Sequence, residues 1–355
     1  MPSVLALLLC VVFVLFLLRL DRREAPEVSF ALWRPTAWLL VISTKPLATW
    51  FGVAVDDEGS PLDRVVLSGF ICLGIFLLAK RKVDLWHAIN SNSWLFLLIA
   101  YMLVTILWSD MPYISFKRWI RELGSVIMAL VVLSERDPRQ AVQSVLRRTV
   151  YILIPFSLLL IKYFQEYGIN FNRYVAIGER MWVGVTVDKN GLGRLCLISS
   201  FFLVWTLIVK WRRREVPRIR FLLYADVAVL LIALFLLRGP QDGASNAYPA
   251  TAIGALGIGV ASFIVLLLME KWRINLGLNI VMMLVASIIV LGFVTVIMGG
   301  STVAGFTSAF DRGETLTGRT DIWAIILPYF ERSPIGGYGF GSFWTPKIRE
   351  SVWGN

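Results

Sequence analysis

Long apolar runs recur along this 355-residue chain, and they limit its fold more than any other feature does. A transmembrane helix needs about 20 mostly apolar residues, with a range of roughly 17–25. Hydrophobic residues make up 57% of the sequence, well above the share found in soluble globular domains. The sequence therefore predicts an all-α, polytopic membrane protein for which the bilayer acts as the solvent.

Ten apolar segments are candidate spans, and the alternative count is nine. The second segment is the doubtful one, because Lys45-Pro46 interrupts it and would make it interfacial or re-entrant. The ten segments are 3–20, 36–54, 65–79, 93–108, 119–133, 150–161, 192–209, 221–237, 247–269 and 274–298.

The connections between these segments alternate in charge. Segments 80–82, 136–148, 210–220 and 271–273 are short and basic, whereas 56–58, 108–110, 162–189, 239–248 and the residues after 299 are longer, glycine-rich and mixed in sign. Short basic loops face the cytoplasm, so the second set is predicted to be periplasmic in a bacterial inner-membrane protein. The net charge of +11 then reflects topology, and no nucleic-acid partner is expected.

Two regions follow from this topology. Residues 1–298 are predicted to form one multi-span transmembrane domain, and residues 299–355 a large periplasmic loop. A loop this rich in Trp and Tyr is expected to pack on the helices and to return to the membrane. Because the sequence stops inside the loop, the chain is interpreted as C-terminally truncated.

The first candidate site segment contains Asp110, Lys117 and Arg118, around the start of the fifth predicted span. Tryptophan at headgroup depth and Lys or Arg snorkelling to lipid phosphates give the ordinary interpretation of such a segment. The alternative is contact with a phosphorylated substrate.

The second segment lies in the loop before the seventh span and contains Arg180, Lys189, Asn190 and Arg194 among several glycines. A helix start offers unpaired N–H groups and the positive end of its dipole, so cations beside it make an anion site. Arg194 is expected to face a wet cavity or to pair with an acid, because a charge in lipid is costly.

The third segment is centred on Arg319. Thr317 or Thr320 is suited to cap a short helix that runs through Phe330, which would place Arg319 at a helix N-terminus. Arginine suits bidentate recognition of a diphosphate, and the alternative is simple pairing with a nearby acid such as Asp321. The glycines that follow lack the spacing of nucleotide-binding loops.

No cofactor is expected, and the metal prediction is also none. One rival to this view is the acid pair Asp56 and Glu58, which is of the kind that holds a metal in some lipid-sugar glycosyltransferases. The single histidine, His87, falls in a predicted cytoplasmic loop, on the wrong side for a periplasmic general base.

The candidate segments together resemble the O-antigen ligase-like superfamily, in particular its exopolysaccharide-production, polymerase-like branch. The resemblance covers nearly the whole chain and also includes Leu32-Trp33-x-Pro35-Thr36 and Thr44-Lys45-Pro46. Its main motifs are Trp108-Ser109-Asp110, Phe116-Lys117-Arg118, Lys189-Asn190-x-Leu192-Gly193, Gly318-Arg319-x-x-x-Trp323 and Gly337-Tyr338-Gly339-Phe340-Gly341.

The resemblance implies polymerisation or ligation of glycans carried on undecaprenyl diphosphate, with membrane lipids and other polysaccharide assembly and export proteins as further partners. It implies that Arg319 binds the donor diphosphate, with Lys189, Arg180 and Arg194 as the other cations. Lys117, Arg118, Asn190 and Asp110 are possible supporting residues. The family's loop histidine, which activates the acceptor, has no match here and is expected beyond Asn355.

Two alternatives remain beside the enzyme. One is a polysaccharide or lipid transporter, which would need polar groups near the middle of the membrane. The other is an inactive, truncated remnant of the enzyme. The sequence leaves polymerase and ligase unseparated, because the two would share a donor site.

Overall fold

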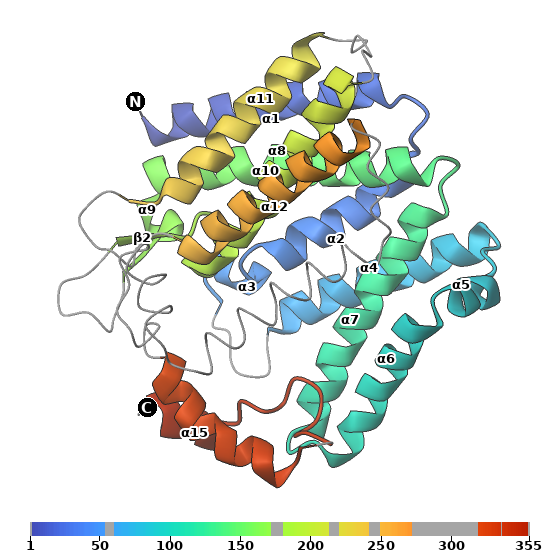
Figure 1. Cartoon of the computed structure of the whole chain (residues 1–355), viewed down its shortest axis with the longest axis vertical. Helices are drawn as coiled ribbons and strands as arrows, with labels where there is room; N and C mark the ends of the chain where they lie inside the picture. The colour runs from blue at the N-terminus through green and yellow to red at the C-terminus, as the bar shows by residue number, and fades with distance from the viewer. Residues whose placement is uncertain are drawn as a thin grey trace.

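The computed structural model of the chain describes residues 2–53, 60–171, 180–212, 220–240, 249–271, 319–334 and 336–353, and these residues are almost all helical (Figure 1). The predicted all-α membrane fold is confirmed. Six described helices are long and apolar enough to cross a membrane, and the total of about ten spans stays a prediction. The predicted span 274–298 and the first part of the predicted periplasmic loop lie outside the described residues.

The six long apolar helices are α1 (Ser3–Glu24), α4 (Pro61–Lys80), α8 (Pro138–Tyr163), α10 (Lys189–Arg212), α11 (Arg220–Arg238) and α12 (Ala250–Lys271). A bend of 96° separates α5 (Leu85–Ser91) from α6 (Ser93–Val104) and the 3-10 turn η2 (Thr105–Trp108). The other helices are α2 (Trp33–Ser43), which follows η1 (Phe30–Leu32), α3 (Leu47–Trp50), α7 (Pro112–Leu133), α9 (Gln165–Gly168), α15 (Arg319–Arg332) and α16 (Pro346–Trp353). Strands β1 (Ile169–Phe171) and β2 (Arg180–Trp182) pair antiparallel.

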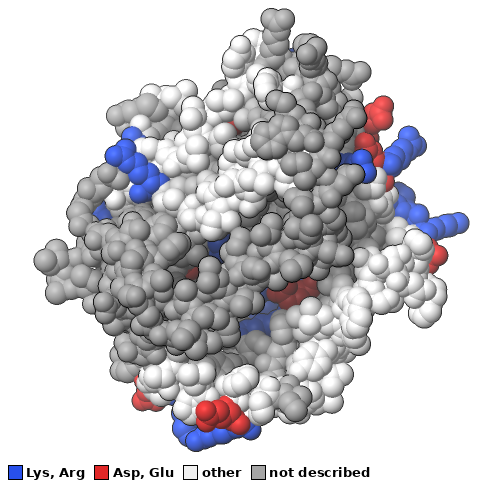
Figure 2. Space-filling model, in the orientation of Figure 1, with Lys and Arg blue, Asp and Glu red and all other residues white. Residues whose placement is uncertain are grey.

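The outer surface of the helices is apolar, as lipid contact requires. Val12 of α1, Phe76 of α4 and Ile258 of α12 are all more than half exposed, at 63%, 62% and 61%. On the face shown in Figure 2, charged side chains gather near the edges, and uncharged atoms fill much of the described surface between them. A soluble protein rarely exposes so much contiguous apolar surface.

The second apolar segment is divided where the sequence predicted a break. α2 ends at Ser43, and Pro46 separates it from the short α3. Before α2, the Ser29 hydroxyl donates to Glu135 Oε1 at 2.6 Å, just beyond the end of α7. After α2, the Lys45 N–H donates to the Val185 carbonyl at 2.9 Å, near the end of α8. The segment therefore extends from one end of the helices to the other, which favours a crossing over a re-entrant loop.

These two ends can be named by their residues. The basic end carries Arg81, Glu135, Arg147 and Lys210, and the loop end carries Lys45, Ser109 and Lys189. At the basic end, Glu135 accepts hydrogen bonds from Ser29 and Arg81. Burial alone would raise the pKa of Glu135, but these hydrogen bonds and the Arg81 charge outweigh it and lower the pKa below its usual value. The carboxylate therefore stays ionised beside Arg81.

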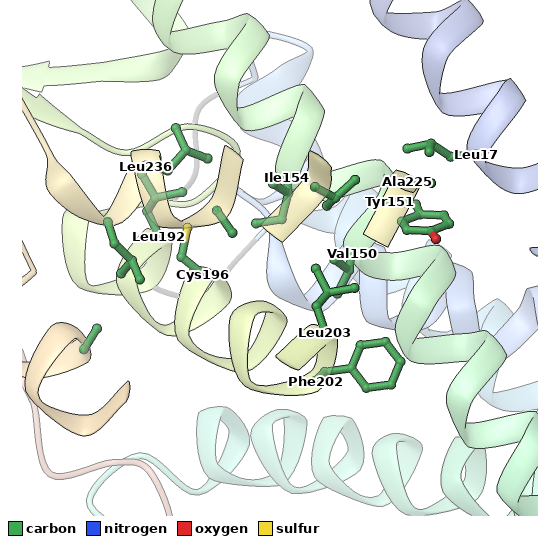
Figure 3. Close-up of a cluster of buried hydrophobic side chains, with 14 of the residues drawn as sticks. Leu17, Val150, Tyr151, Ile154, Leu192, Cys196, Phe202, Leu203, Ala225 and Leu236 are labelled. Atoms are coloured by element: carbon green, nitrogen blue, oxygen red, sulfur yellow. The ribbon is translucent and has the colours of Figure 1, made fainter. Parts of the chain in front are cut away.

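Helix α8 is the centre of the fold. Of its apolar stretch, 78% is buried, against at most 44% for the other long helices. Side chains from α1, α8, α10 and α11 interlock around it in the main core, where Tyr151, Ile154 and Leu203 are fully buried (Figure 3). The sequence predicted only residues 150–161 as apolar span, which was too short because α8 starts twelve residues earlier, at Pro138.

The extra length of α8 carries Arg147 and Arg148 into the protein interior. Both are at most 3% exposed, and their partners come from other helices. Arg148 Nε donates to Asp21 Oδ2 of α1 at 2.7 Å, while Arg147 lies 3.5 Å from Asp21 Oδ1 and 3.8 Å from Asp226 Oδ1 of α11. The Tyr151 hydroxyl completes the cluster by donating to Asp226 at 2.6 Å.

The cluster is balanced in charge. Lys210 of α10 lies 3.5 Å from Glu24 and 3.8 Å from Asp226, so three acids, Asp21, Glu24 and Asp226, face three bases, Arg147, Arg148 and Lys210. Unpaired charges cost several kcal/mol each in a low-dielectric interior, which makes this balance a condition for burying them. The cluster therefore holds α1, α8, α10 and α11 in one arrangement at the basic end.

We predict that Arg147→Ala lowers the free energy of unfolding by about 3–5 kcal/mol, because it leaves Asp21 and Asp226 with less neutralising charge in the interior. Thermal unfolding of the purified protein in detergent measures the change. Arg22→Ala, which removes an exposed arginine from the end of α1, is the matched control and should have little effect. Equal losses in the two variants would contradict the role of the cluster.

Candidate functional site

Two of the three predicted site segments meet at the loop end. The glycine-rich segment 336–342 packs against the turn that leads from η2 into α7, although more than 220 residues separate them in sequence. Trp108 Nε1 donates to the Gly336 carbonyl at 2.8 Å, and the Ser109 hydroxyl donates to Ser342 Oγ at 2.7 Å. Figure 1 shows the result, with the C-terminal segment lying against the ends of α6 and α7.

Further hydrogen bonds make the contact specific. The Phe340 N–H donates to Thr105 Oγ1 at 3.1 Å, and the hydroxyl of the fully buried Ser115 lies 2.8 Å from that of the half-buried Ser109. Ser342 is itself fully buried and donates to the Tyr338 carbonyl at 2.7 Å. These polar groups are satisfied across the contact, so the segment has one preferred register on the turn.

Two glycines allow this close approach. Gly339 has φ of +87°, and a Cβ added there would lie 2.5 Å from Ser109 Cβ and 2.8 Å from its Cα. Gly341 has φ of +66°, and a Cβ there would lie 2.9 Å from Arg118 Cδ. At both positions the left-handed backbone conformation strains any residue with a Cβ. At Gly339 the overlap with Ser109 adds to that strain, whereas at Gly341 the flexible Arg118 side chain would have to shift.

The cations of the first segment lie around this contact. Arg118 passes beside Gly341, and Lys117 Nζ lies 4.2 Å from the centre of the Tyr113 ring. Asp110 is exposed at the turn itself. Of the predicted supporting residues, Arg118 thus contacts the docked glycine segment, Asp110 follows the docked Ser109, and Lys117 lies on the same first turns of α7.

An aromatic cluster joins the same segment to α15. The Tyr338 hydroxyl donates to the Tyr329 carbonyl at 2.9 Å, and the Tyr338 ring packs edge-on against Tyr329 and Phe343. Helix α15 is described from Arg319, while Thr317, one of the two residues predicted to cap it, lies outside the described residues. Fourteen residues of helix span about 20 Å, so Arg319 lies well away from the end that the aromatic cluster fixes. The side chain of Arg319 lies outside the described residues.

The second segment occupies the loop end at the start of α10, which Lys189 and Asn190 open. Asp188 Oδ1 accepts the Gly191 N–H at 2.7 Å, so this chain's own carboxylate takes one of the donors that the sequence interpretation offered to a substrate anion. Lys189 is half-buried, and Asn190, Arg180 on β2 and Arg194 on α10 are exposed.

Both segments lie at the same end of the helices. A four-residue turn joins α7 to α8 at the basic end, so α7 starts at the end where α8 finishes. From there α9 and the β1–β2 hairpin lead into α10. Gly184, at φ +54°, packs on Ser157 of α8, where a Cβ would meet the serine at 2.7 Å. The structure therefore joins the first and third segments directly and places the second on the same side.

Lys45 is a buried cation at the loop end, which the sequence analysis named as an interruption and as part of a resembling motif but not as a site residue. It is 8% exposed, and its Nζ donates to the Tyr167 carbonyl beside the hairpin. The Trp50 indole donates to the Lys45 carbonyl at 3.2 Å and stacks on Tyr167. A lysine followed by proline inside an apolar run was the signal that marked this position. Its partners are backbone groups far away in sequence.

Within the described part of the chain, no group of three or more His, Cys, Asp or Glu side chains is placed to bind a metal ion. The rival acid pair, Asp56 and Glu58, lies outside the described residues.

Comparison with known proteins bears on the same region. Residues 247–353 match the sequence family described as O-antigen ligase, a range that includes α12, α15 and the docked glycine segment. No solved structure matches the chain.

One curated relative aligns over most of the chain. It is the exopolysaccharide production protein ExoQ of Rhizobium meliloti (strain 1021), which is 24% identical over 280 residues. The alignment covers 79% of this chain and 58% of the relative, so the chain spans little more than half the length of that protein. Together the two matches agree with the resemblance that the motifs indicated, because both make this chain similar to O-antigen ligase-like and exopolysaccharide-production proteins.

Proposed function

We propose that this protein polymerises or ligates glycans carried on undecaprenyl diphosphate, at the periplasmic face of the bacterial inner membrane. The family match and the relative's role in exopolysaccharide production support glycan processing. The observation that carries the proposal is the docking of segment 336–342 on the Trp108–Ser109 turn. It brings two of the resembling motifs and Arg118 together at one end of the helices, where a lipid-linked donor would present its headgroup.

The proposed reaction needs fixed positive charge beside the leaving diphosphate, and we propose no cofactor for it. The acceptor hydroxyl attacks the anomeric carbon of the donor sugar, the bond to the carrier diphosphate breaks, and the diphosphate leaves with additional negative charge. Cations held at that leaving group stabilise the transition state, and such a contact is typically worth about 2.7–4 kcal/mol. We assign this role to Arg319 at the start of α15 and to Lys189 at the start of α10, with Arg180 and Arg194 nearby.

The docked segment serves as the support of this site. Its glycines bring the backbone within contact distance of Ser109 and Arg118, and its aromatic residues fix the far end of α15. The position of Arg319 therefore depends on a contact made near the start of α7. Lys117, Arg118, Asn190 and Asp110 have supporting roles in this proposal, and the base that activates the acceptor is not assigned to a described residue.

The buried charges favour one alternative, a polysaccharide or lipid transporter. Transporters need polar groups inside the membrane domain, and Arg147 and Asp226 are such groups. Their charges are nevertheless balanced within the cluster, which suits a structural role better than the binding of a moving substrate. Purified protein in detergent separates the two functions, because an enzyme elongates a lipid-linked oligosaccharide there and a transporter, lacking two compartments, does nothing measurable.

We predict that Arg319→Ala and Lys189→Ala each reduce polymer formation about 100-fold or more in cells, while the protein still accumulates in the membrane. The loss reflects the missing charge at the leaving diphosphate. Arg332→Ala is the matched control, because it removes an exposed arginine from the other end of the same helix. It should stay within about twofold of the unchanged protein. Normal polymer from both test variants would overturn the assignment.

A second prediction tests the docking by steric means. Gly339→Ala should abolish most polymer formation, because its methyl group would overlap Ser109. Gly337→Ala is the control, since Gly337 also has positive φ, at +59°, but has open space around its Cβ position. The control thus carries a similar backbone strain of about 1 kcal/mol without the overlap. If both alanines reduce polymer equally, docking at Ser109 is not what the site requires.

A further inference from the structure

Lys45 connects the two ends of the loop that leads from α8 to α10. Its Nζ donates to the Tyr167 carbonyl of α9, just before the β1–β2 hairpin. Its backbone N–H donates to the Val185 carbonyl at 2.9 Å, just after the hairpin. Residues 168–184 lie between these two contacts in the sequence, so one lysine closes the base of this loop.

Aromatic rings flank the Lys45 side chain. Lys45 is 8% exposed, and its Nζ lies 5.9 Å from the centre of the Trp50 ring, which stacks on Tyr167. Asp63 of α4 fixes the short helix that carries Trp50, because its Oδ1 accepts the Leu47 N–H at 2.7 Å. A hydrogen bond in a poorly hydrated place is stronger than one in water, so the lysine holds the entry to the hairpin in one position.

A second set of hydrogen bonds extends from the exit of the hairpin to the start of α10. Thr186 follows Val185 and is 4% exposed, and its hydroxyl lies 2.9 Å from the Asp188 carbonyl. The Asp188 carboxylate accepts a backbone N–H from the first turn of α10 at 2.7 Å. Lys189 is the next residue along the chain. Its backbone position therefore depends on contacts that begin at Lys45.

We propose that Lys45 and Thr186 are positioning residues for the glycan reaction, and that both act through Lys189. The inference rests on the proposed function, from which it takes the role of Lys189 at the leaving diphosphate. Both positioning residues are buried, so neither needs to touch the donor. A shift of about 1 Å in a group that stabilises the transition state can lower the rate substantially, even when the altered residue is remote from the chemistry.

Kinetics of the purified full-length protein in detergent, with a radiolabelled lipid-linked oligosaccharide, test the proposal. Lys45→Met keeps the length of the side chain but removes the ammonium group. We expect kcat to fall about tenfold, the scale of losing one hydrogen bond to a charged group. KM should stay within about twofold, because Lys189 acts on charge that develops only in the transition state. Lys45→Arg should recover most of the rate.

The matched control is Lys162→Met, which removes an exposed lysine from the last turn of α8 at the same end of the helices. It should leave both kcat and KM unchanged. An equal loss in Lys45→Met and Lys162→Met would overturn the proposal.

A double-variant cycle distinguishes positioning from general destabilisation. If Lys45 acts through Lys189, Lys45→Met should change kcat by less than about twofold once Lys189→Ala is present. A further tenfold loss in that background would overturn the inference and leave the proposed function standing. Full activity of Lys189→Ala alone would overturn both. Thr186→Val tests the same path from its other end, and it must show the same dependence on Lys189 even where Lys45→Met fails to fold.

Discussion

Two adjacent arginines inside a helix that the membrane surrounds must be neutralised, and the arrangement of the helices depends on how this is done. Arg147 and Arg148 of α8 meet Asp21 of α1 and Asp226 of α11, with Lys210 and Glu24 balancing the remainder. Removing the acids from α1 or α11 would leave the arginines as isolated charges in a medium where each is costly. The balance therefore fixes which helices surround α8 and at what height along their length they do so.

That arrangement carries through α8 to the loop end. There the helix supports the hairpin before α10, because Gly168 and Gly184 approach α8 so closely that a Cβ on either would lie within 3 Å of it. Lys45 joins the α2–α3 break to the same hairpin. The start of α10, with Lys189, is positioned by these contacts. Different contacts position the start of α7. They come from the docked glycine segment, which in turn contacts α15.

Much of this fold follows from local pattern, and the rest depends on distant partners. Apolar runs located the long helices, and the sequence also predicted a helix running through Phe330, which α15 contains. The predicted fifth span began at residue 119, although helix α7 starts at Pro112, because its first turns carry Lys117 and Arg118 and are not apolar. The predicted sixth span was also shorter than α8, because it excluded the charged Arg147 and Arg148. The acid that pairs with Arg148 lies 127 residues earlier in the sequence. No local pattern contains that information. The motifs singled out Trp108 and the glycine segment separately, and only the structure shows that they touch.

Cross-linking tests whether the glycine segment docks at the Trp108–Ser109 turn and whether that turn lies on the proposed periplasmic side. Ser109→Cys and Ser342→Cys are introduced together into a chain whose three native cysteines, Cys10, Cys72 and Cys196, are replaced. The two serine oxygens are 2.7 Å apart, so the paired cysteines should form a disulfide in intact cells without added oxidant, as the oxidising periplasm allows. A pair at Ser93, the first residue of α6, and Ser342, which contacts Ser109 beyond the other end of that helix, should stay reduced. Absence of the Ser109–Ser342 disulfide, or its formation only after the membrane is opened and an oxidant added, would contradict the account.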